Sequence, residues 1–267
     1  MSIPCIYPRM LNPSPSLYHL ALLLSLSCLT PLTYSQTKKP AYTIQHIAEH
    51  DPSAFTQGLS CSGDVLYEST GLYGQSSLRT HNPDNFSLTH NAALPNRFFG
   101  EDITLWYNTI WQLTWREHTL LSYDPNTLSP GTRHYYQGEG WGLTHNQNYF
   151  IMSNGSHCLQ YRDPHNFSLI SSHCLFYQDK PLGKINALDT RNGILLANLF
   201  PTDTIAVIDL PTHAVLATLD LSGLRTYLHN PDAGVLNGLC YRSNGDIILT
   251  GKNWDKIFVL QLALPTP

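Results

Sequence analysis

The chain has 267 residues, a formal net charge of -4 and only 13% charged residues. A chain of this length can form one large domain, and the lack of a basic excess argues against nucleic-acid binding. Eighteen Pro and seventeen Gly are typical of a fold with many tight turns.

The first element in chain order is a candidate export signal. Arg9 supplies a positive charge, residues 17–29 form a short Leu-rich apolar region, and small residues follow, with a cleavage site expected at Thr33-Tyr34-Ser35. We therefore expect residues 1–35 to be a signal peptide. Residues 36–267 would then form one exported domain, either periplasmic or secreted.

Lipid attachment at Cys28 is an alternative fate for the exported chain. It is the weaker one, because Ser25 stands where a lipoprotein signal prefers Leu. No apolar run is long enough to remain as a membrane span once the signal is cleaved. We expect the mature protein to be a monomer.

A strand is predicted next, at residues 42–47, and a motif that recurs five times follows it. Each copy is a triplet that ends in Leu or Ile and leads into an apolar strand. The first residues of the copies lie 44, 40, 45 and 51 positions apart. A period of about 40–50 residues is typical of a β-propeller. The copies are Gln57-Gly58-Leu59, Glu101-Asp102-Ile103, Trp141-Gly142-Leu143, Asn186-Ala187-Leu188 and Asn237-Gly238-Leu239.

Each unit continues past its triplet in the same way. A second apolar strand comes about ten residues later, and a third follows, for example at 119–123 and 205–208. A turn built on Asn-Pro or Asp-Pro then recurs at 82–88, 124–128 and 163–169. Pro presets φ and Asn tolerates the left-handed region, so this turn should join strands three and four of a blade.

The fifth unit, 237–262, holds three strands and then the chain ends. The missing fourth strand is available at 42–47. We expect it to complete the last blade and close the ring, which would remove exposed sheet edges. The predicted fold is therefore an all-β, five-bladed β-propeller closed by its N-terminal strand.

Four cysteines would remain after signal cleavage, and an exported chain permits disulfides. Cys158 and Cys174 flank one predicted hairpin and are the preferred pair. Cys61 and Cys240 occupy nearly equivalent places in the first and fifth repeats, which would be neighbours in a closed ring. Four buried free thiols remain the alternative. No CxxC pair is present, so neither a zinc ribbon nor a redox motif is indicated.

The first residue of each triplet should face the central axis, and these five residues differ chemically. They include one carboxylate, Glu101, and no His. The thirteen His of the chain show no spacing typical of a metal-ligand cluster, and catalytic zinc needs three nearby protein ligands. We therefore expect neither a metal nor another cofactor.

Eight motifs stand in an order that resembles one family, the plant and bacterial type of glutamine cyclotransferase, also called glutaminyl-peptide cyclotransferase. The resemblance covers roughly residues 41–262. It rests on Phe55-Thr56-Gln57-Gly58-Leu59, Tyr67-Glu68-Ser69-Thr70-Gly71-Leu72-Tyr73-Gly74, Phe99-Gly100-Glu101, Gln112-Leu113-Thr114-Trp115, Glu139-Gly140-Trp141-Gly142-Leu143, Ile185-Asn186-Ala187-Leu188, Leu236-Asn237-Gly238-Leu239 and Thr250-Gly251-Lys252-Asn253-Trp254.

The resemblance implies a five-bladed propeller that acts on peptides or proteins with an N-terminal glutamine. It would convert that residue to pyroglutamate and release ammonia, at one mouth of the central channel. It implies that Glu101 is the acid/base group and that Lys252 can stabilise the oxyanion. The implied substrate contacts are Phe55, Gln57, Phe99, Trp115, Trp141, Asn186 and Phe200. Phe200 stands where the family usually has Trp, so it lacks an indole N–H.

Each of these residues also has a purely structural interpretation. A Glu in a Gly-Glu-Asp turn or a Lys at a strand end is ordinarily solvated, and amides can tie inner strands together. Aromatic residues can pack between blades, which is the role we expect for Trp106, Trp111 and Trp254.

Two other functions remain open on sequence grounds. A propeller lactonase or lyase would share the fold only, and a lactonase would need several axial carboxylates. A non-catalytic binding propeller is the second alternative.

Overall fold

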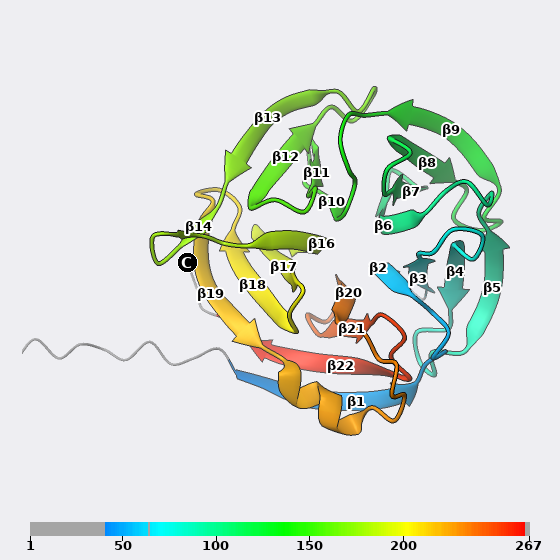
Figure 1. Ribbon diagram of the computed structural model, residues 1–267, viewed down its shortest axis with the longest axis vertical. Helices are drawn as coiled ribbons and strands as arrows, with labels where there is room; N and C mark the ends of the chain where they lie inside the picture. Colours follow the sequence, from blue (N-terminus) through cyan, green and yellow to red (C-terminus); the bar gives the residue numbers. More distant parts are fainter. Residues whose placement is uncertain (1–40, 64, 265–267) are drawn as a thin grey trace, which may run out of the picture. The chain divides into compact units, whose positions relative to one another are not determined.

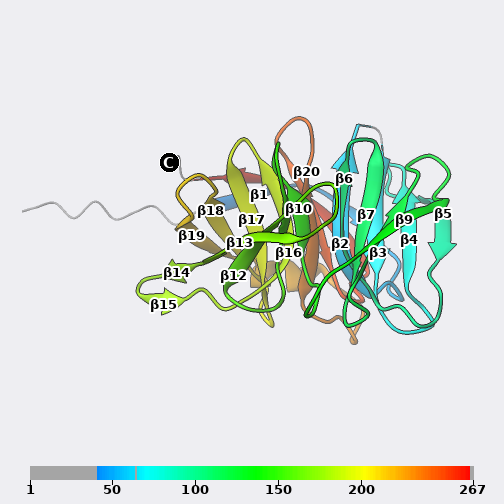
Figure 2. The same ribbon diagram turned by 90° about the horizontal axis from the view of Figure 1, so that it is seen from above.

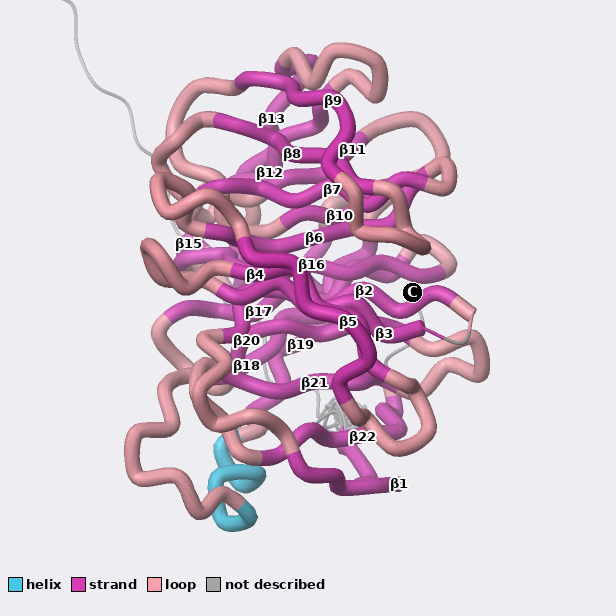
Figure 3. The backbone as a smooth tube through the Cα atoms, turned by 90° about the vertical axis from the view of Figure 1, so that its right-hand side faces the viewer, coloured by secondary structure: helices cyan, strands magenta, loops and turns pink. Residues whose placement is uncertain are grey.

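The computed structural model describes residues 41–63 and 65–264. The expected signal peptide, residues 1–35 with Cys28, lies outside the described residues. The described chain consists of strands, turns and one short 3-10 helix, η1 (Ser222–Tyr227), drawn in cyan in Figure 3. No helix among these residues has the length and apolar character needed to cross a membrane.

Five antiparallel sheets of four strands each surround a common centre (Figure 1), and Figure 2 shows them edge-on. In chain order, the first sheet contains β2 (Thr56–Ser62), β3 (Val65–Thr70), β4 (Ser77–His81) and β5 (Leu88–Ala93), and the second contains β6 (Gly100–Trp106), β7 (Thr109–Thr114), β8 (Thr119–Tyr123) and β9 (Pro130–Tyr135). The third sheet contains β10 (Leu143–His145), β11 (Phe150–Met152), β12 (Cys158–Arg162) and β13 (Leu169–Cys174). The fourth sheet contains β16 (Lys184–Arg191), β17 (Ile194–Phe200), β18 (Thr204–Asp209) and β19 (Ala214–Asp220). A separate hairpin pairs β14 (Phe176–Tyr177) with β15 (Lys180–Pro181).

The fifth sheet combines both ends of the described chain. Its order is β1 (Ala41–Glu49), β22 (Lys256–Ala263), β21 (Ile247–Gly251) and β20 (Leu236–Tyr241). β1 pairs antiparallel with β22, with Ile47 opposite Phe258 and Glu49 opposite Lys256. The N-terminal strand therefore supplies the fourth strand of this sheet.

The five-bladed propeller predicted from the repeats is confirmed. The inner strands β2, β6, β10, β16 and β20 contact one another in a cycle, each touching the next and β20 touching β2. The third strand β8 is buried at every position, whereas the outermost strands β5 and β9 are almost wholly exposed. The apolar core thus lies between neighbouring sheets, as expected when sheets pack face to face.

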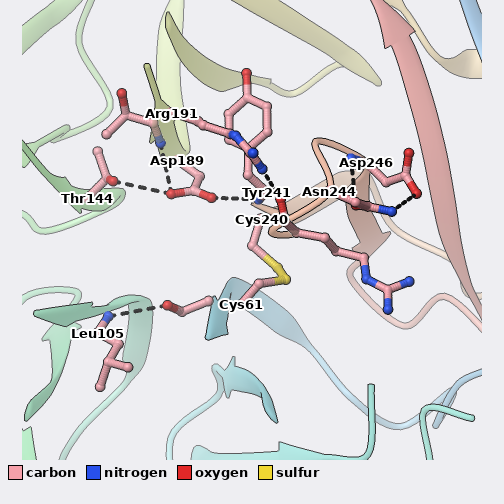
Figure 4. Close-up of a disulfide and its surroundings, with 12 residues drawn as sticks. Cys61, Leu105, Thr144, Asp189, Arg191, Cys240, Tyr241, Asn244 and Asp246 are labelled. Atoms are coloured by element: carbon pink, nitrogen blue, oxygen red, sulfur yellow. Dashed lines mark hydrogen bonds between the residues drawn. A yellow bond between two sulfur atoms is a disulfide. The ribbon is translucent and has the colours of Figure 1, made fainter. Parts of the chain in front are cut away.

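Two buried carboxylates tie the inner strands together near the axis. Asp102 on β6 accepts backbone N–H groups from Leu143 on β10 and Leu188 on β16, both at 2.9 Å. Asp189 on β16 accepts the backbone N–H of Tyr241 on β20 at 2.7 Å (Figure 4). Burial raises the pKa of Asp102 well above its ordinary value and that of Asp189 to about 6. Each carboxylate therefore joins blades that share no ladder hydrogen bonds.

A buried cluster around Glu68 joins the first blade to the segment after β1. Its carboxylate has no exposed surface and contacts His50 Nε2 at 3.1 Å and His81 Nε2 at 2.9 Å. Thr56 donates its hydroxyl to Glu68 Oε1 at 2.6 Å. The spacing of the His residues did not indicate this cluster, because His50 lies in the segment after β1 and His81 ends β4 of the first blade.

Both disulfides expected from the sequence are formed, and the alternative of four free thiols is wrong. Cys158 and Cys174 pair across β12 and β13. Cys61 on β2 and Cys240 on β20 form the second bond, drawn in Figure 4. The second bond covalently links the first and fifth blades.

Candidate active site

The nine residues proposed for the site line one cavity of about 250 Å³. They come from all five blades, and the structure brings every one of them together. The cavity is lined by Phe55, Gln57, Leu72, Phe99, Glu101, Trp115, Trp141, Asn186, Phe200 and Lys252. Leu72 was missed by the sequence analysis, although it lies within one of the eight motifs and could have been found there.

Hairpin geometry explains why residues so distant in sequence gather at one face. In an antiparallel hairpin the start of the first strand lies beside the end of the second. Gly100 therefore pairs with Thr114, and Lys184 pairs with Phe200. This places Phe99, the second residue before Glu101, beside Trp115, whose backbone N–H donates to Phe99 O at 2.9 Å. It also places the start of each inner strand at the same mouth of the ring.

A β-bulge sits at the start of four of the five inner strands. The pairing register shifts between Thr56 and Gly58, Gly100 and Ile103, Ile185 and Leu188, and Leu236 and Leu239. The first triplet residue lies within each irregularity. Bulges re-aim side chains and are frequent beside active sites. The repeated triplet is therefore the sequence signature of a bulge.

Glu101 is 5% exposed and has an ordered polar partner. Gln57 donates its side-chain N–H to Glu101 Oε1 at 3.3 Å, and Asn237 donates to Gln57 Oε1 at 2.8 Å. Because Asn237 occupies the carbonyl end of the Gln57 amide, the N–H end faces Glu101. Burial raises the pKa of Glu101 well above its ordinary value, and Lys252 opposes that shift.

Lys252 is held by rings rather than by a counter-ion. Its Nζ lies 4.9 Å from the ring centroid of Phe55 and 5.4 Å from that of Phe200. Within residues 41–63 and 65–264 no oxygen accepts a hydrogen bond from this ammonium and no carboxylate forms an ion pair with it. Burial lowers the pKa of Lys252, and the charge of Glu101 works in the opposite direction. Its donors remain available to a ligand.

Asn186 also presents an unused group. The residue is 2% exposed, and its side-chain oxygen has no hydrogen-bond partner among the described residues. A buried amide oxygen without a donor costs free energy unless a ligand or water supplies one. Asn186 Oδ1 can therefore accept a hydrogen bond from an amine or amide bound in the cavity.

The aromatic residues of the cavity form two groups of contacting rings. Phe99 lies 5.4 Å from Trp115 and 6.3 Å from Phe55 between ring centroids, and Trp141 meets Phe200 edge-on at 5.5 Å. These five rings line the cavity. Trp106 and Trp254 are in the core between blades, and Trp111 packs against that core, as the sequence analysis expected.

Glu139 is a further residue that the sequence analysis did not assign to the site. It accepts the indole N–H groups of both Trp115 and Trp141. Glu139 directly precedes Gly140-Trp141 in one of the eight motifs, and this position could have indicated it.

One group among the described residues has metal-ligand proximity, namely His157, Cys158 and Cys174. The two cysteines are bonded to each other, so they offer no thiolate. None of these three residues lines the cavity described above.

Comparisons with known proteins agree with one another. The family model described as glutamine cyclotransferase matches residues 18–262. The chain is 34% identical over 228 residues to the glutaminyl-peptide cyclotransferase of Arabidopsis thaliana, covering 82% of this chain and 71% of that protein. The crystal structure of Myxococcus xanthus glutaminyl cyclase superimposes with a TM-score of 0.78 at 29% identity, covering 85% of this chain and 99% of that one.

Proposed function

The chain belongs to the glutamine cyclotransferase family, and from this premise we propose that it converts N-terminal glutamine of peptides and proteins to pyroglutamate, with Glu101 as the proton-transfer group. One observation carries the proposal for Glu101. A buried carboxylate faces a small cavity that also holds an unpaired amide oxygen, a free ammonium and aromatic walls.

The reaction needs no second substrate. The α-amino nitrogen of the glutamine attacks its own side-chain amide carbon, and a five-membered lactam forms. The bond from that carbon to the amide nitrogen then breaks, and ammonia leaves. Three tasks remain for the protein: to remove a proton from the α-ammonium, to stabilise the oxyanion and to protonate the leaving nitrogen. Because the step is intramolecular, holding the side chain folded back supplies much of the rate.

Glu101 can perform the first and third tasks in turn. Its carboxylate takes a proton from the α-ammonium, and the resulting acid gives a proton to the departing nitrogen. The second proton, which the α-nitrogen loses once the new C–N bond has formed, passes to the released ammonia, which leaves as ammonium. A carboxyl group whose pKa is raised by burial toward the operating pH is suited to both steps. The Gln57 donor at 3.3 Å fixes one oxygen and leaves the other for the substrate.

Lys252 and Asn186 both line the cavity, and we propose that they bind two different parts of the reacting group. The Lys252 ammonium can donate to the oxyanion that develops on the amide oxygen. Asn186 Oδ1 can accept from the α-ammonium, because it lacks a donor among the described residues. These two contacts would orient the amine toward the amide carbon.

The aromatic rings of the cavity serve the chemistry in two ways. Apolar rings exclude water, which favours attack by the substrate's own amine over hydrolysis. Their faces also attract the α-ammonium by cation–π interaction before it loses its proton. Phe200 contributes area without the N–H donor of an indole, so we propose a weaker substrate contact at this position.

The test is ammonia release from a Gln-initiated peptide, with the 17 Da mass loss of ammonia followed by mass spectrometry. We expect Glu101→Gln to lose about 10²–10⁴-fold in kcat. Asp84→Asn is the matched control, because Asp84 is exposed and lies in the turn between β4 and β5. Unchanged turnover in Glu101→Gln would contradict the assignment of Glu101. A loss of activity with chelator would favour a metal-dependent lactonase-like enzyme instead.

We also propose that the protein is exported, that residues 1–35 are removed and that the mature form is a monomer. The two disulfides support this, because such bonds persist in oxidising compartments. N-terminal mass analysis of the protein recovered from the periplasm or medium tests the cleavage, and light scattering tests the monomer. An uncleaved cytosolic chain would contradict the export proposal.

A further inference from the structure

One carboxylate oxygen joins two walls of the cavity. Glu139 lies in the loop between β9 and β10, and its Oε2 accepts the indole N–H of Trp115 at 3.0 Å and that of Trp141 at 3.0 Å. Its Oε1 accepts the Nε–H of Arg116 at 3.0 Å. Both oxygens of this side chain are therefore engaged, although the side chain is 36% exposed.

We propose that Glu139 is a positioning residue that sets the spacing of Trp115 and Trp141, and so the width of the slot that receives the glutamine side chain. This inference rests on the proposed function. Trp115 follows β7 of the second blade and Trp141 precedes β10 of the third. The two rings therefore belong to different sheets. The backbone N–H of Gly140 donates to Trp115 O at 2.9 Å and ties the two main-chain segments, but among the side-chain hydrogen bonds of the described residues only those to Glu139 Oε2 tie the two indole rings to each other.

Each indole is also backed on one face. The Arg116 guanidinium lies 3.7 Å from the ring centroid of Trp115. Gly155 packs against Trp141, and a Cβ there would lie 2.6 Å from a ring carbon. Gly155 has φ +75, a conformation that suits glycine. With one face covered and the N–H edge tethered, each ring can turn little, and it offers its remaining surface to the cavity.

The carboxylate form of Glu139 is maintained by its donors. Partial burial would raise the pKa of Glu139, but the hydrogen bonds from Trp141, Arg116 and Trp115 outweigh it and lower the pKa. The charge also reaches the catalytic group, since Glu139 helps to raise the pKa of Glu101 together with Asp102 and Glu117, against Lys252. Removing the Glu139 charge should therefore lower the pKa of Glu101.

The test compares Glu139→Leu, Glu139→Gln and the control Asp84→Asn in steady-state ammonia release from a Gln-initiated peptide. Leu removes the acceptor and both tethers, so we expect KM to rise by about tenfold or more, on the scale that misplacing a positioning group produces. Gln keeps an amide oxygen that accepts an indole N–H, so we expect partial rescue, with KM within about threefold of the wild type. Asp84→Asn should leave KM unchanged.

Two readouts separate positioning from mere folding. The acid limb of the kcat/KM profile should move to lower pH in Glu139→Gln, because a negative charge near Glu101 is lost. A double-mutant cycle that combines Glu139→Leu with Trp141→Phe should show non-additive effects on KM, because Phe keeps a ring but has no N–H to donate to Glu139. Two results would overturn the proposal. One is a Glu139→Leu variant whose melting temperature falls while its KM stays within twofold of the wild type, and the other is full additivity of the KM effects in the cycle.

Peptide binding distinguishes this proposal from the proposed function. Affinity for a Gln-initiated peptide can be measured in the Glu101→Gln background with and without Glu139→Leu. If the wild type releases no ammonia, the proposed function fails, and a tenfold affinity loss here would still support the slot. Equal peptide affinity with and without Glu139→Leu, or no peptide binding in either variant, would overturn the positioning role of Glu139.

Discussion

The cluster around Glu68 permits a quantitative prediction about stability. Burial alone would raise the pKa of Glu68, but the charges and hydrogen bonds of His50 and His81 hold it well below its usual range. Burial alone would lower the pKa of His50, and Glu68 reverses this and raises it. Glu68→Gln removes the one carboxylate that these groups share. Removing one partner of a buried ion pair costs about 3–5 kcal/mol.

The size of the domain converts this cost to a melting temperature. At about 2–4 °C per kcal/mol for 150–250 residues, we expect Glu68→Gln to melt roughly 6–20 °C lower than the wild type. Asp84→Asn, an exposed carboxylate changed in the same way, should melt within about 2 °C of the wild type, since exposed substitutions usually cost under 0.5 kcal/mol.

The sign of the pH dependence follows from the two shifts. The Glu68 contribution is fully present above its unfolded-state pKa of about 4.3 and is lost as the pH falls through its lower folded value. The His50 contribution is fully present below about 6.5 and is lost as the pH rises through its higher folded value. The difference in melting temperature between the wild type and Glu68→Gln should therefore be largest between these two pH limits. Circular dichroism melts at about pH 5.5 and pH 9 measure it, and a difference of under 3 °C, or one equal at both pH values, would refute the reasoning.

Three further predictions concern the site and the ring. Lys252→Met removes the charge that opposes the raised pKa of Glu101, so the acid limb of kcat/KM should move to higher pH, and kcat should fall by about 10²–10³-fold in ammonia-release assays. Gly58→Ala should lower the free energy of unfolding in urea by about 3 kcal/mol, because its Cβ would lie 1.8 Å from Asp102 Oδ1. Cys61→Ser opens a bond that spans 179 residues and should cost about 2–5 kcal/mol, a difference that reductant should abolish.

The repeat made the fold predictable from sequence. The strand predicted at 42–47 lies within β1. The family that the eight motifs resemble is also the family of the matching model and of the Arabidopsis relative. The Cys61–Cys240 pair followed from the same count, because these residues hold equivalent places in repeats that are neighbours in a five-membered ring. The Cys158–Cys174 pair followed from the predicted hairpin that the two residues flank. These predictions succeeded because each depends on spacing, which a sequence records directly.

The polar ties between blades were not predictable in the same way. Only the first residue of each triplet was expected to be axial, so Asp102 and Asp189, which accept backbone N–H groups of other blades, were not predicted. The cluster of His50, His81 and Glu68 was not predicted either. Such contacts depend on bulges and on which sheet faces which, and neither leaves a periodic trace. The roles of the cavity residues remain predictions, although the cavity contains all of them.

Two consecutive carboxylates, Glu101 and Asp102, show why hydrogen bonding rather than pKa distinguishes a reactive group from a structural one. Burial raises the pKa of both. Asp102 accepts three backbone N–H groups, from Ile103, Leu143 and Leu188, so protonating it would break bonds that join three blades. Glu101 receives one side-chain amide at 3.3 Å and faces the cavity, so it can gain or lose a proton without disturbing the ring. The bulge at the start of β6 sends these neighbours in different directions, which is how one short turn provides both the anchor of the fold and the group proposed to transfer protons.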